Sequence, residues 1–277
     1  LLVSMPYVLM RDLLPQRLWT RALALLSGMW GVATLLGPAV GGLFTEYASW
    51  RFAFFASVPA VLGVAIAAMY SFRAAPPAKA APPVPVAQLS ILAAAVLAAS
   101  WGSSADQIWH GVVAMAVAAS LLYWLALKDA HATARLLPAT TYESGSVLAA
   151  LYGLSALLAV TVTCTEVFVP LFLQKIQQHG PLAAGYIAAS ASAGWTLASV
   201  WSSTQRGELA DRCIRLAPVL CCISMLSLAY LLRRPALGDA LGVGATLVAL
   251  VVGGAGVGIA WPHLAGAILG AAVGADE

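Results

Sequence analysis

Charged residues are scarce in this sequence. Only 9% of its 277 residues are Asp, Glu, Lys or Arg, whereas about a quarter of a typical soluble domain is charged. Hydrophobic residues make up 61% of the chain. This composition excludes a soluble globular protein. The net charge of +3 is small and scattered, which excludes a nucleic-acid-binding protein, so we expect the lipid bilayer to be the surroundings of the chain.

The residue patterns of metal sites and enzymes are missing as well. The four cysteines, Cys164, Cys213, Cys221 and Cys222, have no Cys-x-x-Cys spacing and no nearby histidine, so they predict no metal site. Neither a His-Glu-x-x-His motif nor a phosphate-binding loop occurs, and no Ser/His/Asp set is evident within one half of the chain. We therefore expect no catalytic residues and no cofactor.

Long apolar runs fill the sequence instead. About 20 apolar residues in a helix cross the hydrocarbon layer of a bilayer, and Leu1–Met10 resembles the end of such a helix. The pattern predicts about eight full spanning helices and this partial one. The eight expected helices cover residues 22–44, 52–72, 89–101, 108–127, 147–173, 183–203, 216–232 and 241–264.

Basic residues predict how these helices cross the membrane. If residues 11–21 are cytoplasmic, ten Lys and Arg residues fall in cytoplasmic loops and four fall in external loops, as the positive-inside rule requires. The Ala/Pro-rich residues 74–87 then form an extended, semi-rigid cytoplasmic linker. The four external residues are Arg51, Lys175, Arg233 and Arg234.

The first long run is unusually rich in small residues. Glycines leave backbone bare, and in a membrane they let neighbouring helices approach closely. Two opposite faces of this helix carry small residues, which suits a position between two neighbours, and Pro38 predicts a bend. The alternative is a packing helix with no role in mechanism. The residues concerned are Gly28, Gly31, Gly37, Pro38, Gly41 and Gly42.

A family resemblance starts in the same run. Gly37-Pro38-x-x-Gly41-Gly42, followed by Trp50-Arg51-Phe52-x-Phe54-Phe55-x-x-x-Pro59, resembles the fifth helix and the start of the sixth in the major facilitator superfamily. It is most similar to the drug:proton antiporters, in which this element is called the antiporter motif. The longer family pattern has further glycines where this chain has Ala24 and Ala33.

The order of the helices resembles the fourteen-helix branch of those antiporters. Residues Pro170–Gln174, then Gly180-Pro181-Leu182-x-x-Gly185, resemble the end of that branch's ninth helix and the start of its tenth. The resemblance implies an all-α integral membrane protein with an incomplete major facilitator fold, a fragment from late helix four to helix twelve. The implied parts are the end of an N-terminal helical bundle (1–73), a linker (74–87), an inserted helix pair (88–128) and a partial C-terminal bundle (129–277).

A second family signal precedes the seventh expected helix. Gly207-Glu208-Leu209-Ala210-Asp211-Arg212 resembles the C-terminal copy of the superfamily's cytoplasmic loop motif, and Arg215 matches a later basic position. Ile214 replaces a glycine of that motif. Asp211 and Arg212 either form a latch across the loop or belong to a solvated loop with an incidental ion pair.

One charged residue lies deep in an expected helix. A carboxylate in hydrocarbon costs on the order of a few kcal/mol, so Glu166 is expected either to bind a proton or a cationic substrate, or to reach water near the outer helix end. Thr163 lies beside it. Trp195, in the next helix, either contacts a substrate through its ring or serves in packing. In the last helix, Gly254 and Gly258 are expected to pack closely against a neighbour.

The resemblance implies a multi-pass transporter of the cell membrane. Its expected activity is proton-coupled efflux of drugs or other amphipathic or cationic small molecules by alternating access between two helical bundles. Small-molecule substrates, protons and lipid are its expected partners. The alternatives are export of a metabolite or a self-made antibiotic, and a non-transporting sensor or scaffold that reuses the fold.

Overall fold

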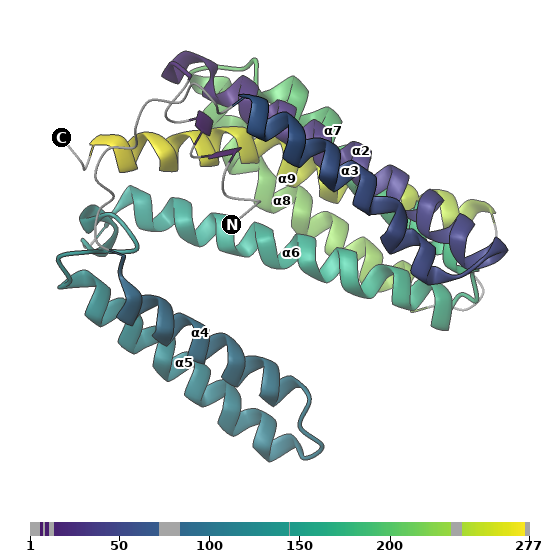
Figure 1. Ribbon diagram of the computed structural model, residues 1–277, viewed down its shortest axis with the longest axis horizontal. Coiled ribbons are helices and arrows are strands. Elements are labelled where there is room, and N and C mark those ends of the chain that lie inside the picture. The colour runs from purple at the N-terminus through teal and green to yellow at the C-terminus, as the bar shows by residue number, and fades with distance from the viewer. Residues whose placement is uncertain are drawn as a thin grey trace. The chain divides into compact units, whose positions relative to one another are not determined.

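A computed structural model describes residues 6–7, 9–10, 14–71, 84–143, 145–233 and 240–274. All regular structure within these residues is helical (Figure 1), which confirms the predicted all-α fold. The long helices are α2 (Trp19–Tyr47), α3 (Trp50–Ser71), α4 (Val86–Ser103), α5 (Ile108–Ala130), α6 (Val147–Lys175), α7 (Pro181–Ser202), α8 (Glu208–Leu231) and α9 (Ala240–Gly274), and two short 3₁₀ turns cover Gln16–Leu18 and Ala139–Tyr142.

Seven of the helices that the structure describes are long and apolar enough to cross a membrane. The eighth, α7, has 22 residues but is not among the seven. Its hydroxyl side chains lower its hydropathy. Among the residues of α7 that are buried are Ser199 and Ser202, so this helix is shielded from lipid by its neighbours along part of its length.

Several helix boundaries differ from the prediction. Helix α4 begins at Val86, inside the predicted linker, and residues 74–83 of that linker lie outside the described residues. Helix α9 ends at Gly274, ten residues beyond its expected end at Leu264. Helix α8 begins at Glu208, eight residues before the expected start at Leu216. Gly207 has a positive φ of 58°, which favours glycine, and Glu208 and Asp211 place negative charge in the first turn, where a helix dipole favours it.

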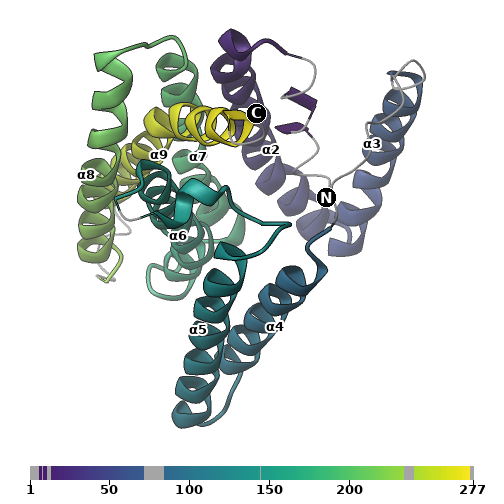
Figure 2. The ribbon, with the colours of Figure 1, turned by 90° about the vertical axis from the view of Figure 1, so that its left-hand side faces the viewer.

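The chain forms two compact units. One contains residues 1–73 and 150–270, and the other contains residues 74–149 and 271–277. In the second unit α4 and α5 lie side by side as a hairpin (Figure 2). A Cβ added at Gly102 would lie 2.6 Å from Cβ of Ala114, so these helices approach closely. The division into bundles and an inserted pair stays a prediction.

Asp129 fixes the loop that follows this hairpin. Its side chain is only 1% exposed at the end of α5. It accepts hydrogen bonds from the backbone N–H groups of Leu136, at 2.7 Å, and Leu137, at 3.1 Å, and from the Tyr142 hydroxyl at 2.6 Å. Three donors therefore converge on one buried carboxylate, as a buried charge requires.

In the first unit, glycines of α9 bring three helices together. A Cβ added at Gly254 would collide with the carbonyl oxygen of Ala191 in α7, and one at Gly258 with the carbonyl oxygen of Trp195. On the α8 side, a Cβ at Gly253 would collide with the Ser224 hydroxyl. The predicted close packing at Gly254 and Gly258 is confirmed, and α9 is held against both α7 and α8.

Candidate substrate cavity

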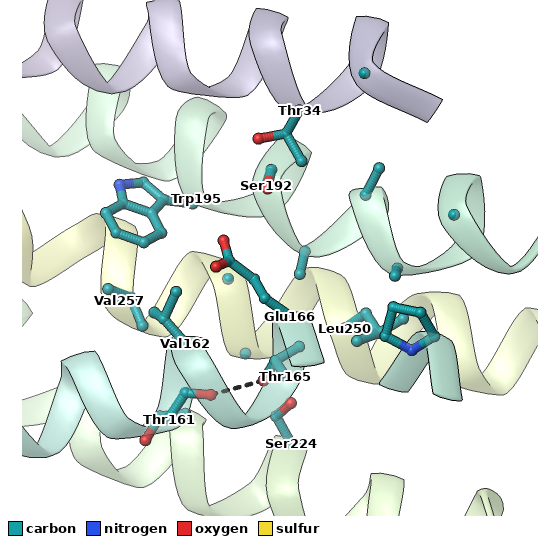
Figure 3. A pocket seen from close by; sticks show the side chains of 18 residues that line it. Thr34, Thr161, Val162, Thr165, Glu166, Ser192, Trp195, Ser224, Leu250 and Val257 are labelled. Carbon is teal, nitrogen blue, oxygen red and sulfur yellow. Dashed lines mark hydrogen bonds between the residues drawn. The ribbon is translucent and has the colours of Figure 1, made fainter. Parts of the chain in front are cut away.

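Two adjoining cavities lie among the helices of the first unit. Their volumes are about 380 Å³ and about 290 Å³. Helices α2, α6 and α7 line both, and α9 contributes to each. Figure 3 shows the first from close by, with polar side chains from three helices turned towards one space. The two cavities share Thr34, Val162, Glu166, Ser192 and Trp195.

Glu166 extends from α6 towards Thr34, Ser192 and Trp195 (Figure 3). It is the only charged residue among the described residues that line the two cavities. Its position, nine residues before the end of α6 at Lys175, places it roughly 14 Å from that end at 1.5 Å per residue. Its side chain is exposed on the cavity wall, and its role as a ligand or proton site stays a prediction.

Trp195 forms the neighbouring wall of the cavity. Its ring packs edge-on against Trp261 of α9, with 6.0 Å between ring centroids and 62° between their planes. Its indole nitrogen is buried and has no hydrogen-bond acceptor. Buried polar groups are nearly always paired, so this N–H is a donor available to a bound molecule. The predicted pair of Glu166 and Trp195 therefore meets at one site.

Thr163 does not belong to this site. Its side chain is exposed, and it lines neither cavity. Thr161 and Thr165 of the same helix line the larger cavity instead, together with Glu166. The Thr165 hydroxyl donates to the Thr161 carbonyl at 2.8 Å, so it also satisfies the helix backbone. The rotation of α6 about its axis decides which of its threonines line the cavity, and the sequence alone does not determine that rotation.

The glycines of α2 divide into two groups. A Cβ at Gly31 would collide with the Thr196 hydroxyl of α7, so the expected close approach is found there. At Gly28, Gly37 and Gly41 an added Cβ would meet no described atom within 4 Å, and the expected close packing at these three glycines stays a prediction. Gly37 instead lines the larger cavity. Pro38 and Gly42 lie within α2, outside the residues whose side chains are described.

The loop motif lies in a helix rather than a loop. Only Gly207 precedes α8, while Asp211, Arg212 and Arg215 lie in its first two turns. Arg212 pairs with Glu208 at 2.7 Å, not with Asp211, and both side chains are well exposed, at 60% and 75%. Such a pair contributes about 0.3–0.5 kcal/mol. Ile214, where the motif has glycine, lets the helix run on without a turn.

His263 makes a contact that the sequence did not indicate. Its Nε2 lies 2.8 Å from the Ser202 hydroxyl and 3.0 Å from the Ser202 carbonyl oxygen. This side chain therefore links α9 to the last turn of α7, where the Ser202 carbonyl also accepts the backbone N–H of Gln205 at 2.9 Å. Within the described part of the chain, no group of three His, Cys, Asp or Glu side chains is placed to hold a metal ion.

Comparison with known proteins identifies the family of this helical fold. The sequence profile of the Major Facilitator Superfamily matches residues 1–274. The chain belongs to the major facilitator superfamily. It is therefore a multi-pass membrane protein of a transporter family, and no solved structure matches it significantly.

Named relatives of this superfamily chain include exporters. It is 34% identical over 273 residues to a protein of Mycobacterium tuberculosis named a probable multidrug-efflux transporter, which covers 95% of this chain and 57% of the relative. It is 27% identical over 184 residues to a tetracenomycin C resistance and export protein of Streptomyces glaucescens, covering 64% of this chain and 34% of the relative. The chain thus spans little more than half of the first relative's length.

Proposed function

We propose that the intact protein exports amphipathic or cationic small molecules across the cell membrane in exchange for protons. The proposal rests on the position of Glu166. Its carboxylate lies on a cavity wall and forms no hydrogen bond or ion pair with any described residue. Small-molecule sites are mostly apolar, with few polar groups, and measure roughly 300–1,000 Å³. Two adjoining cavities of about 380 and 290 Å³ fit that class.

A single carboxylate links cation and proton movement by competition. In an apolar cavity an unpaired negative charge is costly, so Glu166 is stabilised either by a bound cation or by a proton. A proton that reaches the cavity from outside displaces the cation, and loss of the proton to the cytoplasm restores the binding site. Exchange therefore follows if the cavity opens alternately to the two faces.

Trp195 adds the selectivity for amphipathic molecules. Its ring provides an apolar face that attracts cations, and its buried N–H provides a hydrogen-bond donor without an acceptor. A flat molecule with a positive charge and an acceptor atom therefore satisfies both groups at once.

Replacing Glu166 by Gln tests the proposal, because the side chain keeps its shape and loses its charge and titration. We expect export of a cationic dye from vesicles that hold the intact protein to fall by at least tenfold and to lose its dependence on pH. The control is Glu143→Gln, which removes a carboxylate outside the cavities. Unchanged rate and unchanged pH profile in Glu166→Gln would remove Glu166 from the mechanism.

A second candidate is export of an antibiotic that the producing cell makes itself. The similarity to the tetracenomycin C resistance and export protein favours it. Tetracenomycin C should then compete with the dye for export by the wild type. Absence of competition would count against this candidate.

A further inference from the structure

An apolar groove lies between α6 and α8, next to the candidate substrate cavity, with which it shares Thr165 of α6. Its volume is about 520 Å³. The C-terminal ends of the two helices lie together, because the Gln177 amide donates to the Leu231 carbonyl at 3.3 Å. The groove runs back from these ends. Its described lining residues include Phe168, Phe172, Ile176, Met225, Leu228 and Leu232.

One end of the groove is basic and the rest is apolar. Arg233 is the only charged residue among the described lining residues, and it follows directly on the end of α8. Its guanidinium carbon lies 5.0 Å from the centre of the Tyr230 ring. Within the described part of the chain no carboxylate forms an ion pair with Arg233. Lys175 ends α6 at the same end of the helix pair, so a second described positive charge lies near this end.

The length of the groove matches one leaflet of a bilayer. On α6 the lining extends from Cys164 to Ile176, about 18 Å at 1.5 Å per residue. Half of a 30 Å hydrocarbon layer is about 15 Å. Both helices are expected to cross the membrane, and their ends place Arg233 at the level of lipid headgroups. An acyl chain therefore fits along the groove when a phosphate lies at Arg233.

We propose that this groove binds an anionic phospholipid of the surrounding bilayer, with one acyl chain between α6 and α8 and its phosphate on Arg233. The guanidinium complements the phosphate in charge and geometry, and the phenylalanine and leucine side chains complement the chain. A zwitterionic lipid fits the groove equally well but gains less from Arg233. The site does not depend on Glu166, so it stands or falls separately from the proposed export activity.

Lipid titration of the purified protein in detergent tests this site. Bound copies of 1-palmitoyl-2-oleoyl-phosphatidylglycerol and of the matching phosphatidylcholine are counted by native mass spectrometry. Arg233→Gln removes the charged partner of the phosphate in the groove and should reduce the preference for phosphatidylglycerol about fivefold, whereas Arg233→Lys keeps the charge and should retain most of it. Ala229→Trp, which fills the groove from α8, should remove the tightest copy of either lipid.

The matched control is Lys175→Gln. It removes a basic residue that lies at the Arg233 end of the two helices but does not line the groove. Its preference should stay close to that of the wild type. An unchanged preference in Arg233→Gln would overturn the proposal. An equal loss in Lys175→Gln would do so too, because it would mean that surface charge in general attracts the lipid. Glu166→Gln should leave lipid binding unchanged whether or not export is lost.

Discussion

The contact between α7 and α9 gives the most direct test of the packing. Gly254→Ala adds one methyl group where a Cβ would collide with the Ala191 carbonyl oxygen and would lie 2.7 Å from its carbonyl carbon and 3.0 Å from the Trp195 nitrogen. All three atoms belong to the backbone of α7, so no side chain can turn aside. Ordinary contacts of a Cβ start at about 3.4 Å, so the two helices must separate locally.

Overpacking of this kind costs roughly 1–3 kcal/mol. For a domain of this size each kcal/mol shifts the melting temperature by roughly 2–4 °C, so we expect a fall of several degrees. Loss of soluble monodisperse protein on heating in detergent measures this shift. The control is Gly28→Ala, where a Cβ meets no described atom within 4 Å and alanine is the better helix former. Equal melting temperatures of the two variants would refute the close contact.

Two further variants test the second unit and the topology. Asp129→Ala removes the carboxylate that accepts from the backbone N–H groups of Leu136 and Leu137, at roughly 1–3 kcal/mol for each buried donor. Trypsin should therefore cleave after Arg135 faster than in Tyr142→Phe, which removes only one hydrogen bond to that carboxylate. Equal cleavage rates would show that Asp129 does not hold the loop. In intact cells, a single cysteine at Lys175 should react with an impermeant thiol reagent, whereas one at Arg206 should be shielded. Reaction at Arg206 from outside would reverse the predicted orientation.

The helices were predictable because their signal is long and apolar, whereas the ends depended on single residues. Gly207 and the acids of the first turn start α8, but Leu216 is where its apolar run begins, so hydropathy placed the start eight residues late. For helix α7 the length was predicted well but the surroundings were not. Its serines keep it out of the apolar class, because neighbouring helices rather than lipid cover part of it.

The candidate site was predictable in its chemistry but not in its geometry. Scarcity of charge singled out Glu166, since one carboxylate in a long apolar helix stands out in any sequence. The helix rotation that turns Thr165 rather than Thr163 towards the cavity depends on packing against other helices. The contact of His263 with Ser202 joins residues that are 61 positions apart, and no local pattern in the sequence carries such information.

Packing and cavity are linked through Trp195. Its side chain forms a wall of the cavity, while its backbone touches Gly254 and Gly258 of α9. His263 holds the other end of the same pair of helices together. Sliding α7 along α9 would drive backbone into backbone at the glycines, so we expect the two helices to move as one body. Helix α2 also approaches α7 closely at Gly31, so we expect any movement of the proposed transport cycle to change the α6 side of the cavity, where Glu166 lies.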